Sequence, residues 1–332
     1  MIKKILGLLF ILASAVAVDF YFFLNKPLAV DTAYIYDFKP GTSVSALARD
    51  LEQKKIITNR LYFSLWARIT GTARNLKAGE YELSPELSVL QLFGLMQKGK
   101  VRLYSLTLVE GISFKEMMQK VNASADLTHH LKDLAPQQIM QRIGYPDEHP
   151  EGRFFPDTYR FPRGLSDIDL LRKAYSEMQQ RLQQAWDSRQ AGLPLDSAYE
   201  ALILASIVEK ESAIVEERPQ IAGVFINRLR KGMRLQTDPT VIYGMGDNYK
   251  GDIRFRDLRR DTPYNTYTRK GLPPTPIAMP GQGALDAVTQ PDSTDYIYFV
   301  ALSDRSGRHV FSKTLKEHER AVDEHQRKLN KK

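Results

Sequence analysis

The chain of 332 residues contains no cysteine, and it has only six histidines and two tryptophans. Without cysteine the protein has no disulfide, no thiolate metal site and no lipoprotein anchor. His309 and His318 do not have the spacing of metal ligands. The sequence also lacks a Ser-His-Asp signature, a glycine-rich phosphate loop and an internal repeat. We therefore expect neither a metal nor a cofactor.

One long apolar run is present, at residues 5–24, and Asp19 is the only charged residue within it. Twenty helical residues span about 30 Å, the thickness of the hydrocarbon core of a bilayer. Lys3 and Lys4 precede the run, so the positive-inside rule keeps residues 1–4 in the cytoplasm as a short tail. We predict a transmembrane anchor at residues 5–25, with the rest of the chain outside the cytoplasmic membrane.

The C-terminal end of this run is aromatic. Tyr21, Phe22 and Phe23 are expected at the outer membrane–water interface, where aromatic side chains form a belt. The competing interpretation is a signal peptide that is cleaved after the small residues 13–15. Apolar character continues past this site as far as Leu24, which favours a retained anchor.

The net charge of +8 and the isoelectric point near 9.4 suit an anionic surface such as a membrane, a nucleic acid or an acidic cell-wall polymer. The one basic block is the tail at residues 327–332. A chain anchored outside the cytoplasm would rarely meet nucleic acid, so we predict no nucleic-acid partner. About 300 residues follow the anchor, which is too many for one small core and indicates two or three domains.

Residues 31–100 form the first of three expected regions. Their pattern predicts helices at 44–55, 60–70 and 89–97 and a strand at 77–83. Gly99 is a C-terminal stop for the last of these helices. The arrangement resembles a LysM-like module, a type that binds glycan chains. The alternative is an α+β spacer that holds the following domain off the membrane.

Residues 101–195 form an intermediate α+β region. A strand is expected at 104–109, followed by a helix that Ser113 caps, with Glu116 completing a capping box. The long polar pattern at 167–190 predicts a helix that braces the third region. Between them, residues 151–159 make a compact aromatic loop, which suits either the wall of a cleft or a packed corner.

The third region, residues 196–332, contains a helix whose apolar face includes a carboxylate. Leu204, Ile207 and Glu211 share that face, while Glu209 and Lys210 turn towards the more polar side. A glutamate held against apolar neighbours has a raised pKa, and a carboxyl still protonated near neutral pH can act as a general acid. The alternative is that the helix frays here and Glu211 points into solvent.

Two polar stretches follow, at residues 235–244 and 262–267. Their dense hydrogen-bonding groups suit a sugar-binding wall. Each group also has a structural interpretation: Asp238 before Pro239 has the pattern of an N-cap followed by proline at the first helical position. A helix at 217–231 precedes these stretches, and strands at 296–302 and 308–312 are expected to pair as a hairpin after them.

Five ordered motifs together resemble the endolytic murein transglycosylases, the MltG or YceG-like family. They are LASIVEKE at 204–211, FINRL at 225–229, QTDPTVIYG at 236–244, YNTY at 264–267 and GLPP at 271–274. The resemblance implies a single-pass protein of the bacterial inner membrane whose catalytic domain lies in the periplasm and cuts nascent peptidoglycan strands. It implies an α+β fold with a transmembrane helix, a LysM-like module and a lysozyme-like catalytic domain.

The resemblance also assigns functional residues. It makes Glu211 the catalytic acid, and the pair Glu211-Ser212 is similar to the Glu-Ser pair of lysozyme-like lytic transglycosylases. The residues carried over as substrate-binding are Ser212, Gln236, Asp238, Tyr243, Asn265 and Tyr267. The implied partners are peptidoglycan glycan strands, the inner membrane and peptidoglycan synthases.

A lytic transglycosylase needs one catalytic carboxylate, whereas ordinary glycosidases need two. In this interpretation Glu211 protonates the MurNAc–GlcNAc β-1,4 oxygen and then takes the proton of the MurNAc C6 hydroxyl, which closes a 1,6-anhydro ring. The first alternative is a hydrolysing muramidase with Asp238 or Glu209 as second carboxylate. The second is a non-catalytic wall-binding scaffold that recruits synthases. Anhydro ends, reducing ends or no cleavage distinguish the three.

Overall fold

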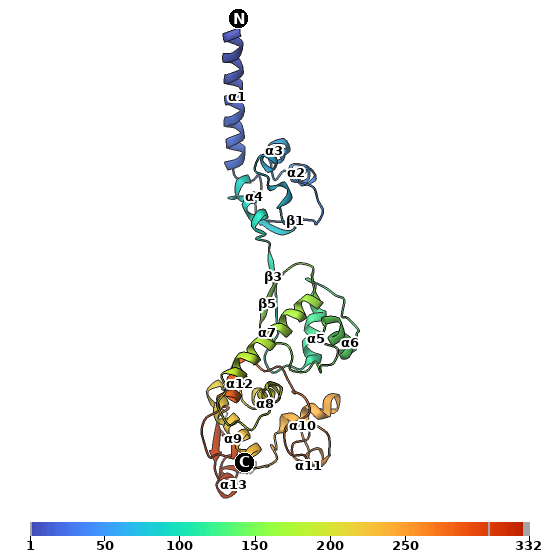
Figure 1. Cartoon of the computed structure of the whole chain (residues 1–332), viewed down its shortest axis with the longest axis vertical. Helices are drawn as coiled ribbons and strands as arrows, with labels where there is room; N and C mark the ends of the chain where they lie inside the picture. The colour runs from blue at the N-terminus through green and yellow to red at the C-terminus, as the bar shows by residue number, and fades with distance from the viewer. Residues whose placement is uncertain (1, 305, 328–332) are drawn as a thin grey trace. The chain divides into compact units, whose positions relative to one another are not determined.

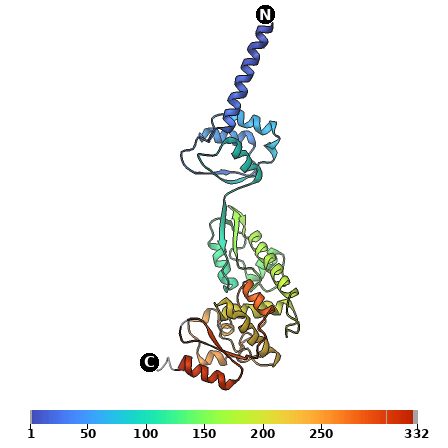
Figure 2. The ribbon, with the colours of Figure 1, turned by 90° about the vertical axis from the view of Figure 1, so that its left-hand side faces the viewer.

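The computed structural model describes residues 2–304 and 306–327, and these form a mixed α+β fold (Figures 1 and 2). The chain divides into two compact units. The N-terminal unit contains Met1–Ser105 and Arg160–Leu165, and the C-terminal unit contains Leu106–Tyr159 and Ser166–Lys332. Met1 of the predicted cytoplasmic tail and Lys328, Lys331 and Lys332 of the basic tail lie outside the described residues.

Helix α1 (Ile2–Asn25) is long and apolar enough to cross a membrane, with a mean hydropathy of 2.2, although a signal sequence would have the same character. Its last turn packs into the core of the N-terminal unit through Phe23 and Leu24. Tyr21 and Phe22 are exposed, and Phe23 is buried against the folded unit. The aromatic belt at the membrane interface remains a prediction.

The N-terminal unit is an antiparallel strand pair covered by helices. Its elements are β1 (Tyr34–Phe38), α2 (Val44–Gln53), α3 (Arg60–Ile69), β2 (Gly79–Leu83) and α4 (Val89–Lys98). β1 and β2 pair with Tyr36 opposite Tyr81, and Tyr81 is fully buried. β2 begins at Gly79, where φ is +143° and an added Cβ would meet Val101. Gly99 ends α4 in the left-handed conformation, which confirms the predicted stop.

The C-terminal unit is mainly helical. Its helices are α5 (Phe114–Ala123), α6 (Pro136–Ile143), α7 (Asp167–Asp187), α8 (Ala198–Glu211), α9 (Arg218–Arg230), α10 (Asp238–Met245), α11 (Phe255–Arg259), α12 (Gln282–Thr289) and α13 (Leu315–Val322). The strands β7 (Tyr298–Ala301) and β8 (His309–Ser312) form the predicted antiparallel hairpin. The short strands β4 (Leu127–Thr128) and β6 (Leu165–Ser166) pair, as do β3 (Leu103–Thr107) and β5 (Thr158–Pro162), and β3, β5 and β6 each contain residues of both units. Ser113 and Glu116 form the predicted capping box.

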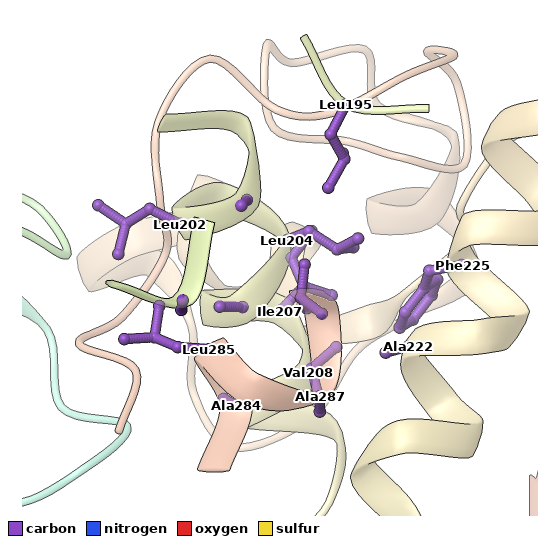
Figure 3. Packing of buried hydrophobic residues seen from close by; sticks show 14 of the residues in the cluster. Leu195, Leu202, Leu204, Ile207, Val208, Ala222, Phe225, Ala284, Leu285 and Ala287 are labelled. Carbon is purple, nitrogen blue, oxygen red and sulfur yellow. The ribbon is translucent and has the colours of Figure 1, made fainter. Parts of the chain in front are cut away.

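Helix α8 is the centre of the C-terminal core. Every residue from 201 to 208 is buried, so the helix is enclosed on all sides and not only on one face. α7, α9 and α12 pack around it. Figure 3 shows Leu204 and Ile207 on the side of α8 towards Phe225 of α9, and Ala287 of α12 beside Val208. The buried part of α8 ends at Val208, and Glu211 is the last residue of the helix.

The same core draws on both regions that the sequence analysis divided at residue 195. Met178, Leu182 and Ala185 of α7 belong to one apolar cluster with the residues of α8. Most of residues 101–195 therefore fold together with residues 196–327. The division into an intermediate region and a catalytic region remains a prediction about function.

Candidate active site

Glu211 lies where the buried helix α8 reaches a cleft. Burial raises the pKa of its carboxyl to about 7, and the negative charge of Asp238 acts in the same direction. A hydrogen bond from Thr237 and the positive charge of Arg228 oppose this increase. The predicted environment of Glu211 is thus present: a carboxyl that holds its proton near neutral pH.

Thr237 fixes the orientation of this carboxyl. Its hydroxyl donates a hydrogen bond to Oε1 of Glu211. The backbone of Thr237 is itself held by two buried threonines: its N–H donates to Oγ1 of Thr266 at 3.1 Å, and its carbonyl accepts from Oγ1 of Thr240 at 2.8 Å. Because Oε1 accepts this bond, Oε2 is the oxygen that is left to carry an acidic proton.

The cleft beside Glu211 has a volume of about 560 Å³. Four residues predicted from the sequence line it together: Glu211, Gln236, Asp238 and Tyr267. The other described lining residues were not predicted, and they are Arg228, Leu235, Tyr298, Phe299, Val300, Ala301, His309, Leu315, His318, Val322 and Gln326. One wall is therefore polar, and the wall formed by β7, β8 and α13 is largely apolar and aromatic.

Asp238 and Tyr267 form a pair on the polar wall. The Tyr267 hydroxyl donates to Oδ1 of Asp238 at 2.5 Å, and burial raises the pKa of this tyrosine above its usual range. α10 begins at Asp238 with Thr237 as its N-cap residue, so the N-cap interpretation of Asp238 was wrong by one position. The Thr237 side chain makes no cap bond because its hydroxyl is committed to Glu211.

Arg228 is the cation of the cleft, and it also organises the loop that carries Gln236. Its Nε donates to the carbonyl of Ile297 at 2.7 Å and its Nη1 to that of Leu235 at 2.7 Å. Gln236 follows in a left-handed conformation with φ of +53°, which is strained for a residue with a side chain. Sequence reasoning placed Arg228 in a motif without a role, since its contacts with Leu235 and with the distant Ile297 arise only in the folded chain.

The opposite wall contains two histidines. The His318 ring stacks on Tyr298 with a centroid distance of 5.0 Å and an interplanar angle of 16°. His309 is paired with Glu217, whose Oε2 lies 2.8 Å from Nδ1. Burial lowers the pKa of His318, so it is neutral at physiological pH. Within the described ranges, no group of three or more His, Asp or Glu side chains is placed to hold a metal ion.

Three further residues predicted as substrate-binding are not among the described residues that line this cleft. Ser212 is buried and its Oγ accepts from the N–H of Ile214 at 3.0 Å. The Tyr243 hydroxyl donates to Oε2 of Glu151 at 3.0 Å. Asn265 is buried and its Nδ2 donates to three backbone carbonyls at the C-terminal end of α11, those of Asp257, Leu258 and Arg260. Their contacts are internal to the fold, and a binding role for them remains a prediction.

Periodicity predicted that Glu209 lies on the polar side of α8, and this prediction was wrong. Its side chain is 4% exposed and pairs with Nη2 of Arg218 at 2.7 Å. Its second oxygen accepts the N–H of Gly281 at 3.0 Å. Arg218 also donates to the carbonyl of Ser212, directly after Glu211. Glu209 is therefore part of a buried clamp at the end of α8, and it lines a different pocket from Glu211.

A buried glutamate with a pKa near 7, on the lining of a cleft, has the character of a general acid, and Glu211 is therefore the candidate catalytic group. Comparison with known proteins shows the family of the chain. The sequence model of the YceG-like family matches residues 36–324. The chain belongs to the YceG-like family.

Relatives are similar over most of the chain. An endolytic murein transglycosylase of Bacillus subtilis is 33% identical, over 93% of this chain and 90% of its own length. One from Streptococcus pneumoniae is 30% identical over 86% of this chain, which spans 57% of that longer protein. A crystal structure of a putative YceG-like protein from Listeria monocytogenes superposes with a TM-score of 0.54 and 32% identity, covering 88% of this chain and 99% of that one.

Proposed function

We propose that the protein is an endolytic murein transglycosylase, a lyase that cuts peptidoglycan glycan strands internally. The observation that carries this proposal is Glu211: its pKa near 7 allows it to be an acid and a base at the same pH. The two relatives from Bacillus and Streptococcus are named for the same activity.

The proposed mechanism uses Glu211 twice. Its Oε2 first gives a proton to the β-1,4 glycosidic oxygen of a MurNAc–GlcNAc bond, which breaks the bond to C1 of MurNAc. The resulting carboxylate is stabilised by Thr237 and by the charge of Arg228. It then takes the proton of the MurNAc C6 hydroxyl as that oxygen bonds to C1. Glu211 is restored to its acid form and the product is a 1,6-anhydro end.

The remaining polar wall supports the charge that develops on the sugar. Asp238 and Tyr267 line the cleft as a hydrogen-bonded pair, and Gln236 lies on the same wall. Fixed dipoles and charges of this kind stabilise an oxocarbenium-like transition state without reorganising. We propose these three residues as the substrate-binding groups nearest to the reaction, and Ser212, Tyr243 and Asn265 as residues that shape the surrounding cleft.

The second candidate function is hydrolysis by a muramidase. It requires a second carboxylate that activates water or attacks the sugar. Glu209 does not suit that role because it is buried against Arg218. Asp238 does lie in the cleft, and it is the one specific observation that favours hydrolysis.

We further propose that α1 is a retained anchor in the inner membrane, with residues 1–4 in the cytoplasm and the chain that follows α1 in the periplasm. Lys3 and Lys4 at the start of α1 support this orientation. An anchored enzyme is also close to the peptidoglycan synthases that make its substrate, and these are the proposed protein partners.

The regional assignments belong to the same proposal. Residues 31–100 act as a LysM-like glycan-binding module, residues 101–195 as an intermediate region and residues 196–332 as a lysozyme-like catalytic region. A shortened protein that begins near Val101 should lose affinity for insoluble peptidoglycan while circular dichroism shows that it is folded. Unchanged sedimentation with peptidoglycan would favour the spacer interpretation of residues 31–100.

Mass analysis of the products from purified sacculi tests the activity. The native protein should release fragments with 1,6-anhydro-MurNAc ends, and Glu211→Gln should release none. Reducing ends would indicate the muramidase. If the folded native protein released no fragments, the scaffold interpretation would replace the enzyme.

A further inference from the structure

Helix α3 carries an exposed row of apolar side chains on the N-terminal unit. Leu61, Leu65 and Ile69 are 71%, 45% and 66% exposed. Their four-residue spacing places them on one face of the helix, within about 80° of one another. Phe63 and Ala67, which are buried in the core, lie on the opposite face. The row therefore contributes nothing to the core of the unit.

A neighbouring face of α3 packs against the end of α1 (Figure 1). The Tyr62 ring centroid lies 5.2 Å from that of Phe20 and 5.6 Å from that of Phe23. The Trp66 ring lies 6.1 Å from Phe20. The Tyr62 hydroxyl donates to Oδ2 of Asp19 at 2.9 Å, so the one charge within the apolar run has a partner. Leu61 and Leu65 directly precede Tyr62 and Trp66, so the apolar row lies on the face of α3 next to this contact and therefore beside α1.

The position of this contact along α1 matches the interface of a bilayer. The apolar run of α1 ends at Leu24, and Phe20 lies four residues earlier, about 6 Å inside that end at 1.5 Å per residue. Amphipathic helices that lie in a membrane interface bury their apolar faces by about 5–10 Å. Tyr62 and Trp66 are also the residue types that concentrate at this depth.

The charged residues of α3 are all basic. Arg60 and Arg68 are exposed, and the helix contains no aspartate or glutamate. Arg60 pairs with Glu52 of α2, whose Oε2 lies 3.5 Å from Nε, so Arg68 is the cation of α3 nearest to being available for headgroups. Lys26, which follows α1, is exposed as well. Positive charge beside an apolar face favours the anionic headgroups of a lipid surface. If the row were instead a docking site for another protein, neither the basic residues beside it nor its position level with the end of a membrane-spanning helix would be required.

We propose that α3 is an interfacial helix that lies in the outer leaflet of the membrane crossed by α1, with Leu61, Leu65 and Ile69 among the lipids. This inference rests on the proposed anchoring role of α1. The contact of Tyr62 and Trp66 with α1 holds the row at the required depth, and Arg68 meets the headgroups. The N-terminal unit is thereby attached to the membrane by two helices.

The absence of cysteine allows single labelling sites in the full-length chain. Leu65→Cys, Phe10→Cys and Ile35→Cys are each labelled with bimane and reconstituted into vesicles of phosphatidylethanolamine and phosphatidylglycerol with brominated acyl chains. Phe10 is exposed within α1 and reports the anchor. Ile35, 42% exposed on β1, is a matched apolar control because Leu65 is 45% exposed. Leu61→Cys and Ile69→Cys repeat the test along the row.

Bromolipids should quench the labels at Phe10 and Leu65 several-fold more than the label at Ile35. Quenching at Phe10 alone would contradict the interfacial role of α3 and leave the anchor intact. No quenching at Phe10 would contradict both the anchor and this inference. Equal quenching at Ile35 would contradict a specific role for α3. A label at Leu65 that is shielded from aqueous iodide but not quenched by bromolipids would show that protein covers the row.

Discussion

At the scale of single residues, Glu211 and Glu209 differ in what surrounds them although they are two positions apart. Glu211 lines a cleft and accepts a hydrogen bond from a threonine hydroxyl. Glu209 is buried, pairs with Arg218 and accepts the N–H of Gly281. The first arrangement leaves a carboxyl oxygen for chemistry. The second uses both carboxyl oxygens to hold the end of α8 in place.

Glu211→Gln should abolish cleavage while the protein stays folded. The amide keeps the shape of the side chain but has no proton to transfer, and loss of general acid catalysis alone lowers a rate by about 10²–10⁴-fold. Because one residue acts as acid and then as base, we expect the upper end of this range or beyond. Release of anhydromuropeptides from sacculi is the measurement, with circular dichroism as the check on folding.

Glu209→Gln is the matched control, and its effect should be on stability. It removes the nearer counter-charge of the buried Arg218 and leaves only the half-exposed Glu110, whose Oε2 lies 3.9 Å from Nη1. The cost should be roughly 3 kcal/mol, near the lower end for breaking a buried pair, because Glu110 remains and the amide still accepts a hydrogen bond. Urea unfolding gives this value. If the folded Glu209→Gln protein were inactive and equally stable, the roles assigned to the two glutamates would be wrong.

Thr237→Val should change the pH dependence of cleavage. Glu211 must be protonated for the first step, so activity falls as pH rises through its pKa of about 7. The Thr237 hydroxyl stabilises the ionised form, and its removal raises that pKa. A hydrogen bond to a charged group contributes about 1.5–3 kcal/mol, which corresponds to roughly one to two pH units. The alkaline limb of the kcat profile should therefore move up, with a lower maximal rate.

Two variants separate this effect from a loss of structure. Thr237→Ser retains the hydroxyl and should restore the native pH profile. Thr289→Val removes another buried threonine hydroxyl, which donates to the carbonyl of Leu285 in α12, and should leave the profile unchanged. An alkaline limb at the native position in Thr237→Val would show that this hydroxyl does not set the pKa of Glu211.

Sequence reasoning found Glu211 because local periodicity placed it beside apolar residues. It did not assign roles to Thr237 or Arg228 or predict the buried state of Glu209, since each depends at least in part on a partner outside its own helix and some of these partners are far along the chain. Thr237 is 26 positions from Glu211, and Gly281 is 72 positions from Glu209. Composition gives no signal for such pairs until the fold brings them together.

At the scale of elements, Glu151 connects two helices of the C-terminal unit. Its Oε1 accepts the N–H of Phe114 at the start of α5, and its Oε2 accepts the hydroxyl of Tyr243 in α10. Of the two interpretations of the loop at 151–159, the packed corner describes Glu151. Burial raises the pKa of this glutamate to about 7.

This pKa makes the stability of the C-terminal unit depend on pH. The folded pKa of Glu151 lies above the unfolded value of 4.5, so its contribution is fully present below pH 4.5 and is lost as pH rises through 7. A difference of 2.5 units corresponds to about 3 kcal/mol. Glu151→Gln removes this titratable group. Relative to the native protein, the free energy of unfolding of the variant should therefore increase by up to about 3 kcal/mol as the pH rises from 5 to 8. Parallel urea titrations across this range would show a constant difference if the pKa of Glu151 were not raised.

Most element positions followed from local signals. Caps and the glycine stop gave α4 and the start of α5 closely. The helix predicted at 217–231 matches α9 to within one residue at each end, and the start of α10 was predicted one residue late. The enclosure of α8 on all sides was not predicted, because periodicity over its sequence indicated a single apolar face. The rest of the surface of α8 is covered by α7 and α12, which belong to other parts of the chain.

At the scale of the whole molecule, the proposed orientation predicts which side of the membrane the C-terminus occupies. Lys3 and Lys4 precede α1, so a tag placed after Lys332 should be cleaved by protease added outside spheroplasts. The intact protein should also retain its N-terminus. A protected tag would reverse the orientation, and a mature N-terminus near Val16 would identify α1 as a signal peptide.

The central claim is that Glu211 alone serves as acid and base, so that no water enters the reaction. Digestion of purified glycan strands in water enriched in heavy oxygen, followed by mass spectrometry of the new ends, tests this directly. We expect 1,6-anhydro-MurNAc ends, each one water lighter than a reducing end, with no heavy oxygen incorporated. Reducing ends that carry one heavy oxygen would contradict the claim and identify a hydrolase that uses a second carboxylate.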